Sequence, residues 1–238
     1  MDARGHELNK SERRALVGLV VVAAAVSGIG PVDRYTWGLE VAIVVGVGAL
    51  LAWLRPPVTR GLARLLMAYA LVMLVGAHYT YGEAPPGEWL AGWLGLERNP
   101  YDRVGHLLQG LVPASAVLVL GPRLGAMGPG RRLRVLALAA GLGTVALFEG
   151  LELVFAGLAP AGADFVQAQG DPHDTAWDVA FAAVGSLLAL GLPWGGRAGA
   201  AGPGPAGVSA PLAGRPELQP AGSLEGEPAG RLSQERKL

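Results

Sequence analysis

Six apolar runs, separated by short polar links, occupy most of the chain up to residue 194. A helix needs about 20 residues to cross the hydrocarbon core of a bilayer, and most of these runs approach that length. A helix also satisfies every backbone N–H and C=O within one segment, as lipid requires. The pattern therefore predicts an all-α fold, a polytopic membrane helix bundle with about six transmembrane helices. The predicted spans are residues 15–29, 38–54, 62–81, 103–120, 135–158 and 176–194.

The polar segments divide the chain into three parts. Residues 1–14 form a short charged flank, and residues 15–194 form the transmembrane domain. Residues 195–238 are rich in Gly, Pro and Ala with scattered charges, so we expect a disordered tail there. Within the transmembrane domain, residues 88–94 have the amphipathic pattern of a helix that lies along a membrane surface.

Composition agrees with the membrane class, because 51% of the 238 residues are hydrophobic, 16% are charged and the mean hydropathy is +0.38. The absence of cysteine excludes disulfides, thiol catalysis and thiolate metal sites. The net charge is zero, so it points to no class of partner. We expect membrane lipid around the protein and no nucleic-acid partner, while the substrate and the oligomeric state stay open.

Basic residues predict the orientation in the membrane, because cytoplasmic links carry an excess of Lys and Arg. They concentrate before the first span, in every second link, and after the last span. We therefore expect both termini in the cytoplasm and the acidic ends of the helices at the outer face. The basic residues at the predicted cytoplasmic side are Lys10, Arg13, Arg14, Arg55, Arg60, Arg64, Arg123, Arg131, Arg132, Arg134 and Arg197.

Ionisable residues recur at helical spacing near the predicted outer ends of the last three spans. Asp102 and His106 are four residues apart and share one helical face, as do Glu149 and Glu152, three residues apart. Asp178 opens the last apolar run. Such groups are costly inside a membrane unless they pair or bind something. We therefore expect these five residues to converge in one pocket that opens at the outer surface.

The chemistry of this set suggests a divalent metal as the candidate cofactor, since imidazole and carboxylates ligate such ions. The predicted metal ligands are Asp102, His106, Glu152 and Asp178. Glu152 and Asp178 are also candidate catalytic residues, together with Glu149 as a general base or as a residue behind the ligands. Without a metal, the crowded carboxylates would need another neutralising group.

Three further residues complete this prediction. Arg103, or a proton shared among the carboxylates, could neutralise the cluster in place of a metal. Asp174, four residues before Asp178, is expected at the rim of the pocket. Glu40 lies in the first turn of the second span and could join the cluster, whereas His78, beside two tyrosines, is interpreted as an interfacial residue.

Three segments resemble the YjdF family of bacterial inner-membrane proteins, whose function is unassigned. They are residues 99–106, 148–152 and 169–178, and residues 31–35 and 78–81 resemble earlier segments of that family. The resemblance covers residues 15–194 in order. It implies a multi-pass protein of the bacterial cytoplasmic (inner) membrane.

A more distant resemblance is to the VanZ-like membrane proteins, which are linked with glycopeptide resistance. Their pattern has Asp-Lys-x-x-His, then Glu-x-x-Gln, then Asp followed by Asn and Gly. Asp102-Arg103-x-x-His106, Glu149-x-x-Glu152 and Asp178 with Gly185 have the same spacing. This chain departs from the pattern at Arg103, at Glu152 and at Ala182, which replaces the Asn. The resemblance implies one shared polar site and no particular reaction.

Three functions fit these observations, in the following order. The first is a membrane enzyme, a metal-assisted hydrolase acting on a lipid-linked or envelope substrate at the outer face. The second is a small proton-coupled transporter, because intramembrane carboxylates serve as relays, although the inner halves of the last two spans lack further polar groups. The third is a non-catalytic membrane scaffold whose polar groups only pair with one another.

Overall fold

The computed structural model describes residues 8–158 and 173–194, and its regular structure there is helical throughout. This confirms the predicted all-α class. The predicted tail, residues 195–238, and the loop 159–172 lie outside the described residues. The helices are α1 Lys10–Ser27, α2 Arg34–Leu54, α3 Arg60–Tyr79, α4 Pro85–Leu94, α5 Tyr101–Arg123, α6 Arg131–Leu158 and α8 Asp174–Gly191.

Six of these helices are long, and they correspond to the six predicted spans. Four of them, α2, α3, α5 and α6, are each long and apolar enough to cross a membrane by length and composition. The other two are 18 residues long, and each begins with charged residues, α1 at Lys10 and α8 at Asp174. The protein is therefore a polytopic helical membrane protein.

Side-chain caps set where the first three long helices begin. Asn9, Asp33 and Thr59 each accept a hydrogen bond from a backbone N–H three residues later, at Glu12, Thr36 and Leu62. These caps satisfy N–H groups that have no partner within the first turn of a helix. The cap at Asp33 is relevant to the site because Asp33 and Thr36 both line the cavity described below.

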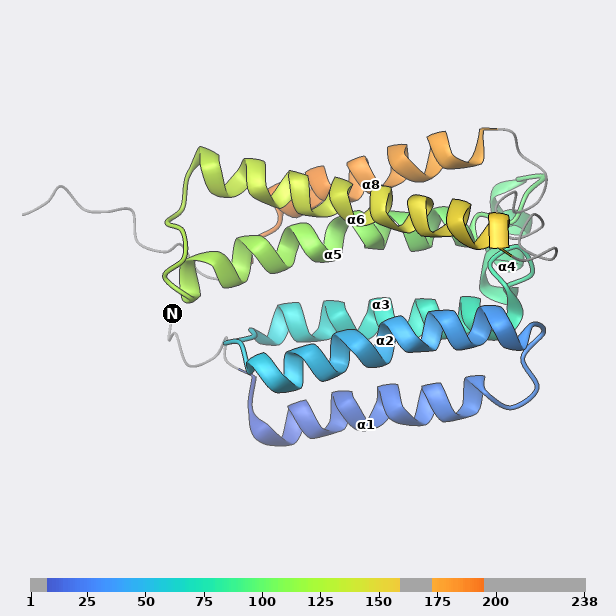
Figure 1. Ribbon diagram of the computed structural model, residues 1–238, viewed down its shortest axis with the longest axis horizontal. Helices are drawn as coiled ribbons and strands as arrows, with labels where there is room; N and C mark the ends of the chain where they lie inside the picture. Colours follow the sequence, from blue (N-terminus) through green and yellow to red (C-terminus); the bar gives the residue numbers. More distant parts are fainter. Residues whose placement is uncertain (1–7, 159–172, 195–238) are drawn as a thin grey trace, which may run out of the picture. The chain divides into compact units, whose positions relative to one another are not determined.

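The long helices form two groups (Figure 1). In one group α3 packs against α1 and α2, and in the other α5, α6 and α8 pack against one another, most extensively α5 with α8. Contacts between α3 and α5 connect the two groups. Successive long helices alternate in direction, so α1 begins and α8 ends at the same end of the bundle. The first residues of α5 and α8, where the acidic side chains are, therefore lie at the opposite end.

Glycines allow α5, α6 and α8 to approach closely. A Cβ at Gly110 of α5 would overlap the carbonyl oxygen of Ala182, and one at Gly185 of α8 would overlap that of Leu107. Ser186 reinforces this contact, since its hydroxyl lies 3.3 Å from the carbonyl oxygen of Gly110 and donates to it. Close packing through small residues is the usual way in which membrane helices associate. Here it brings the first turn of α8 beside the first two turns of α5.

The outer surface of the long helices is apolar, as lipid exposure requires. Trp53 is 78% exposed, Leu147 is 65% exposed and Leu187 is 58% exposed. The short helix α4 confirms the helix predicted around residues 88–94, and its Trp89 and Trp93 are exposed. The position of α4 at a membrane surface stays a prediction.

Candidate functional site

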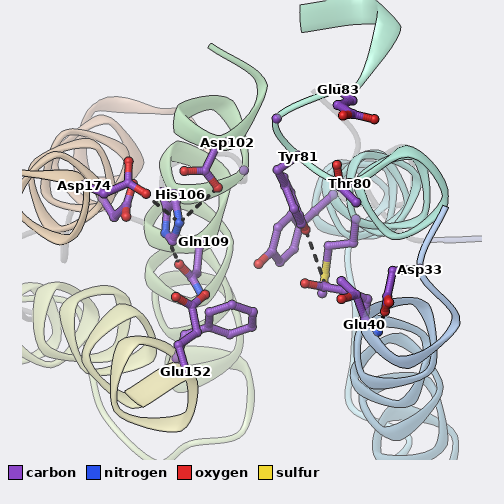
Figure 2. Close-up of a pocket in the computed structure, with 17 residues that line it drawn as sticks. Asp33, Glu40, Thr80, Tyr81, Glu83, Asp102, His106, Gln109, Glu152 and Asp174 are labelled. Carbon is purple, nitrogen blue, oxygen red and sulfur yellow. Dashed lines mark hydrogen bonds and ion pairs between the residues drawn. The ribbon is translucent and has the colours of Figure 1, made fainter. Parts of the chain in front are cut away.

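A cavity of about 630 Å³ lies between the two groups of helices, and its wall is strongly acidic (Figure 2). Residues of α2 and α3 and of the turn after α3 form one side, and residues of α5, α6 and α8 form the other. Among the described residues that line it, the basic side chain is His106, and there is neither Lys nor Arg. The carboxylates on the wall belong to Asp33, Glu40, Glu83, Asp102, Glu152, Asp174 and Asp178.

His106 is the centre of a compact group of three side chains. Its Nε2 lies 3.5 Å from Asp102 Oδ1, one helical turn away on α5, and also 3.5 Å from Asp178 Oδ1 on α8. One donor atom of each residue lies within 4.8 Å of the other two. His106 and Asp178 are buried, and Asp102 is half-buried. The structure thus brings together three of the four predicted metal ligands.

The hydrogen bond at the other ring nitrogen defines the tautomer of neutral His106. Nδ1 lies 2.7 Å from Oε1 of Gln109, an oxygen that can only accept. Nδ1 therefore carries the hydrogen, and Nε2 directs its lone pair towards the two aspartates. A metal-binding histidine is usually held by such a partner on its second nitrogen. A lone pair and two carboxylates facing one another repel unless a cation or a proton lies between them.

The spacing of the donor atoms suits a cation. Two ligands about 2.1 Å from one ion, at a tetrahedral angle, are about 3.4 Å apart. The two measured separations from His106 Nε2 are 3.5 Å, which is long for a hydrogen bond. Within the described part of the chain, the buried Oδ1 of Asp178 has no hydrogen-bond partner. The group can therefore hold a divalent ion with three protein ligands and leave further coordination positions open.

The two predicted residues of α6 have different positions. Glu152 lines the same cavity but is not a member of the three-residue group. Glu149 does not line the cavity, and its buried Oε1 has no hydrogen-bond partner among the described residues. Phe148, the residue before Glu149, also lines the cavity and meets His106 edge to face, with ring centroids 6.4 Å apart. Only Glu152 of this pair is placed to contact a ligand in the cavity.

Arg98 and Arg103, which flank the start of α5, do not line the cavity. Arg98 forms an ion pair with the buried Asp174, which lines the cavity as predicted. Arg103 places its guanidinium over the ring of Trp177, 5.2 Å from the centroid, and near Phe181. The guanidinium of Arg103 thus packs on aromatic rings of α8, and its role in neutralising the cluster stays a prediction.

Sequence reasoning named Glu40 as a residue that could join the cluster, but it missed other residues of the opposite wall, such as Thr36 and Tyr81. Glu40 is 2% exposed and lines the cavity, and Tyr81 donates a hydrogen bond of 3.4 Å to its Oε2. A signal existed, since Asp33, Thr36 and Glu40 have the spacing of one helical face and all three line the cavity. His78 lies outside the cavity, and its Nδ1 is 2.8 Å from the carbonyl oxygen of Ser27.

Asp33 lies at the start of α2, outside the apolar part of the helix. The hydrogen bond from the backbone N–H of Thr36 lowers the pKa of this carboxyl below its ordinary value. Asp33 is therefore ionised at neutral pH and contributes negative charge to the cavity wall. Together with the exposed Glu83, it makes this part of the wall attractive to cations.

Known proteins resemble this chain over most of its length. The family described as "Predicted membrane protein (DUF2238)" matches residues 13–197. The inner membrane protein YjdF of Escherichia coli strain K12 is 39% identical over 168 residues, which are 69% of this chain and 80% of that protein. No solved structure matches at a significant level.

Proposed function

The chain belongs to the DUF2238 family of membrane proteins, and from its site we propose that it binds a divalent cation and hydrolyses a membrane or envelope substrate. The cation is held by Asp102, His106 and Asp178. Glu152, on the wall of the same cavity, is the general base. The observation that carries this proposal is the geometry at His106: two carboxylate oxygens at 3.5 Å from a nitrogen whose tautomer Gln109 defines.

Three protein ligands beside open space are the usual arrangement of a catalytic metal site, in contrast to a closed structural one. A cation held there supplies Lewis acidity and lowers the pKa of a coordinated water. Glu152 is then placed to take the proton, because it lines the cavity without being a ligand. The cavity of about 630 Å³ is within the usual size of small-molecule sites, and its position between helices gives room for a substrate.

A proton-coupled transporter is less well supported by the residues beyond the cavity. In the described residues of α5, α6 and α8, no titratable side chain follows the cavity until the arginines at the opposite ends of α5 and α6. The hydroxyls deeper in these helices, Ser115, Thr144 and Ser186, each donate to a carbonyl four residues earlier in the same helix. They therefore do not continue a relay of titratable groups through the bundle.

We also propose that the cavity faces the outer side of the cytoplasmic (inner) membrane, with both termini in the cytoplasm. The argument is the distribution of charge. Arginines lie in and beside two links, residues 55–59 and 124–130. Both links are at the end of the bundle opposite the cavity. Cytoplasmic links carry this excess of positive charge. A substrate that is reached from this side is an outer-leaflet lipid or an envelope component.

Metal analysis of the purified full chain tests the proposal. After dialysis against Zn²⁺ or Mn²⁺, we expect one equivalent of metal in the wild type and a loss of at least tenfold in affinity for His106→Ala and Asp178→Asn. The matched controls are His173→Ala, at an exposed histidine, and Glu83→Gln, at an exposed carboxylate of the cavity mouth. Equal metal content in wild type and in folded site variants would leave the polar cluster with a structural role only.

A metal-binding protein then needs a catalytic test. Lipid extracts incubated with the loaded wild type should show a product that is missing with Glu152→Gln. That variant should still bind the metal, because Glu152 lies outside the ligand group. A protein that binds metal but forms no product that depends on Glu152 would contradict the hydrolytic part of the proposal.

A further inference from the structure

Glu40 faces the cavity from the side opposite His106, with Tyr81 between them (Figure 2). It is a carboxyl group within the apolar helix α2, and it is 2% exposed. Within the described part of the chain, its hydrogen bonding amounts to the Tyr81 hydroxyl at 3.4 Å. One long bond is little compensation for a carboxylate removed from water inside a membrane protein.

A cationic partner for Glu40 does not come from the cavity wall. Among the lining residues that the structure describes, His106 is the single basic group, and it is engaged by Gln109 and faces the two aspartates. The proposed metal would occupy that opposite group. Any positive charge that neutralises Glu40 must therefore enter the cavity with a ligand, unless the carboxyl keeps a proton.

The surroundings of Glu40 suit an organic cation better than a second metal ion. Tyr69 and Tyr81 line the same wall, and Tyr81 donates its hydroxyl hydrogen to Glu40 Oε2. Hard divalent ions favour sites with several charged oxygen ligands, and Glu40 is one carboxylate beside two neutral phenols. An ammonium group instead needs one carboxylate, and the phenol oxygens and aromatic rings beside it add to the attraction.

We propose that Glu40, Tyr69 and Tyr81 form a subsite for an ammonium group of the substrate. The substrate class is then an ammonium-bearing amphiphile, such as a lipid with an ethanolamine headgroup, whose reacting group faces His106 on the opposite wall. This inference rests on the proposed function for the reaction, but the subsite itself needs no metal. Asp33, which is ionised on the same side of the cavity, attracts the same cation.

Competition between two lipids tests the subsite. The full chain in detergent is offered equal amounts of phosphatidylethanolamine and phosphatidylglycerol with the same acyl chains, and bound lipid is counted by native mass spectrometry. These lipids share the phosphate and differ in the headgroup, which carries an ammonium group only in phosphatidylethanolamine, so that phosphatidylglycerol is also more negative. We expect the wild type to favour phosphatidylethanolamine at least tenfold, and Glu40→Gln to lose most of this preference. Equal binding of the two lipids by the wild type overturns the proposal.

Matched variants separate the ammonium contact from the total charge of the cavity. Glu83→Gln removes the same charge from an exposed position on the wall and should keep the preference. Tyr81→Phe keeps the ring and should retain most of it, whereas Tyr81→Leu should reduce it several-fold. If Glu40→Gln is folded, as judged by thermal unfolding, and still prefers phosphatidylethanolamine as the wild type does, the subsite is not where we place it.

Two further experiments show whether the ammonium group is recognised alone or as part of a lipid, and whether the subsite depends on the metal. Displacement of the lipid by millimolar free ethanolamine supports recognition of the headgroup alone, and a requirement for the acyl chains supports recognition of the whole lipid. Asp178→Asn should lose the metal and keep the lipid preference. If the wild type itself binds no metal and still prefers phosphatidylethanolamine, the hydrolase proposal is wrong and the ammonium subsite stands.

Discussion

Gln109 holds His106 by its Nδ1, with 2.7 Å between that nitrogen and the amide Oε1. Both side chains are buried on α5 and are three residues apart, so one helix sets their relative position. The ring consequently directs Nε2 towards Asp102 and Asp178. Gln109 is a positioning residue in the proposed site, since its effect on a metal passes through the histidine.

Replacement of Gln109 by Leu removes the acceptor while keeping a similar volume. We expect the affinity for Zn²⁺ or Mn²⁺ to fall about 10–100-fold, the usual effect of losing the partner behind a metal-binding histidine. Isothermal titration of the metal-free protein measures it. Gln109→Glu retains an acceptor and should retain most of the affinity. Wild-type affinity in Gln109→Leu would show that the orientation of the ring does not depend on this bond.

Asp178→Asn should stabilise the metal-free protein. The substitution removes a buried charge whose Oδ1 has no hydrogen-bond partner among the described residues, and it adds a donor that can face His106 Nε2 or Asp102. We expect the free energy of unfolding without metal to rise by about 1–3 kcal/mol. Thermal unfolding in detergent with a chelator measures the change. Glu83→Gln, at an exposed position, should change little, and a destabilised metal-free Asp178→Asn would contradict this account.

Asp33 gives a prediction about pH. The hydrogen bond from Thr36 N–H lowers the pKa of Asp33 in the folded protein. The ionised carboxylate therefore contributes its full stabilisation above the ordinary pKa of Asp. This contribution is lost as the pH falls through the lower pKa of the folded protein. Asp33→Ala should cost about 1 kcal/mol at pH 7 and progressively less in acid. Asp33→Asn keeps a cap that cannot titrate, so it should be more stable than Asp33→Ala at every pH. Melting curves between pH 7 and pH 3 compare the three proteins, and a cost of Asp33→Ala that does not change with pH would exclude the ionised cap.

The glycines between α5 and α8 give a prediction about packing. Gly185→Ala places a Cβ against the backbone of Leu107, so we expect a loss of about 1–3 kcal/mol and weaker metal binding as Asp178 shifts. Gly143→Ala is the matched control, because no atom lies within 4 Å of its added Cβ. Thermal unfolding and metal titration of both variants provide the measurement. A Gly185→Ala protein as stable as Gly143→Ala would mean that the helices can separate at little cost.

Reporter fusions test the proposed orientation. A reporter joined after residue 195 should be active only if it functions in the cytoplasm, because we place that end of α8 at the cytoplasmic side. A reporter that is active only outside the cytoplasm, joined within the link between α1 and α2, should report the opposite side. Activity of that outer reporter after residue 195 would reverse the orientation and move the cavity to the cytoplasmic face.

Most of the helices could be predicted because lipid imposes a simple pattern. Apolar runs of sufficient length in a membrane form helices, and the six predicted spans differ from the long helices mainly at their ends. The ends were less accurate because capping by Asn9, Asp33 and Thr59 extends helices into polar residues. A hydropathy pattern does not detect polar residues that are helical.

The site could be predicted in part, for a different physical reason. Asp102 and His106 lie on one helix, so their spacing alone places them on one face, and Asp178 joins them through the close packing of α8. The position of Glu40 depends on contacts between α3 and α5, which no spacing within one helix reveals. Glu149 shows the limit of spacing, since it shares a face with Glu152 and yet does not line the cavity.

The group of three side chains comes from only two helices, with Asp102 and His106 on α5 and Asp178 on α8. A helix turns by about 100° per residue, so a slip of α8 by one residue would carry Asp178 to another side of the helix. The registration of the two helices is fixed by the glycine contacts at Gly110, about one turn along α5 from His106, and at Gly185, about two turns along α8 from Asp178. Mutations in that apolar interface can therefore switch the proposed metal chemistry off while every cavity residue is unchanged.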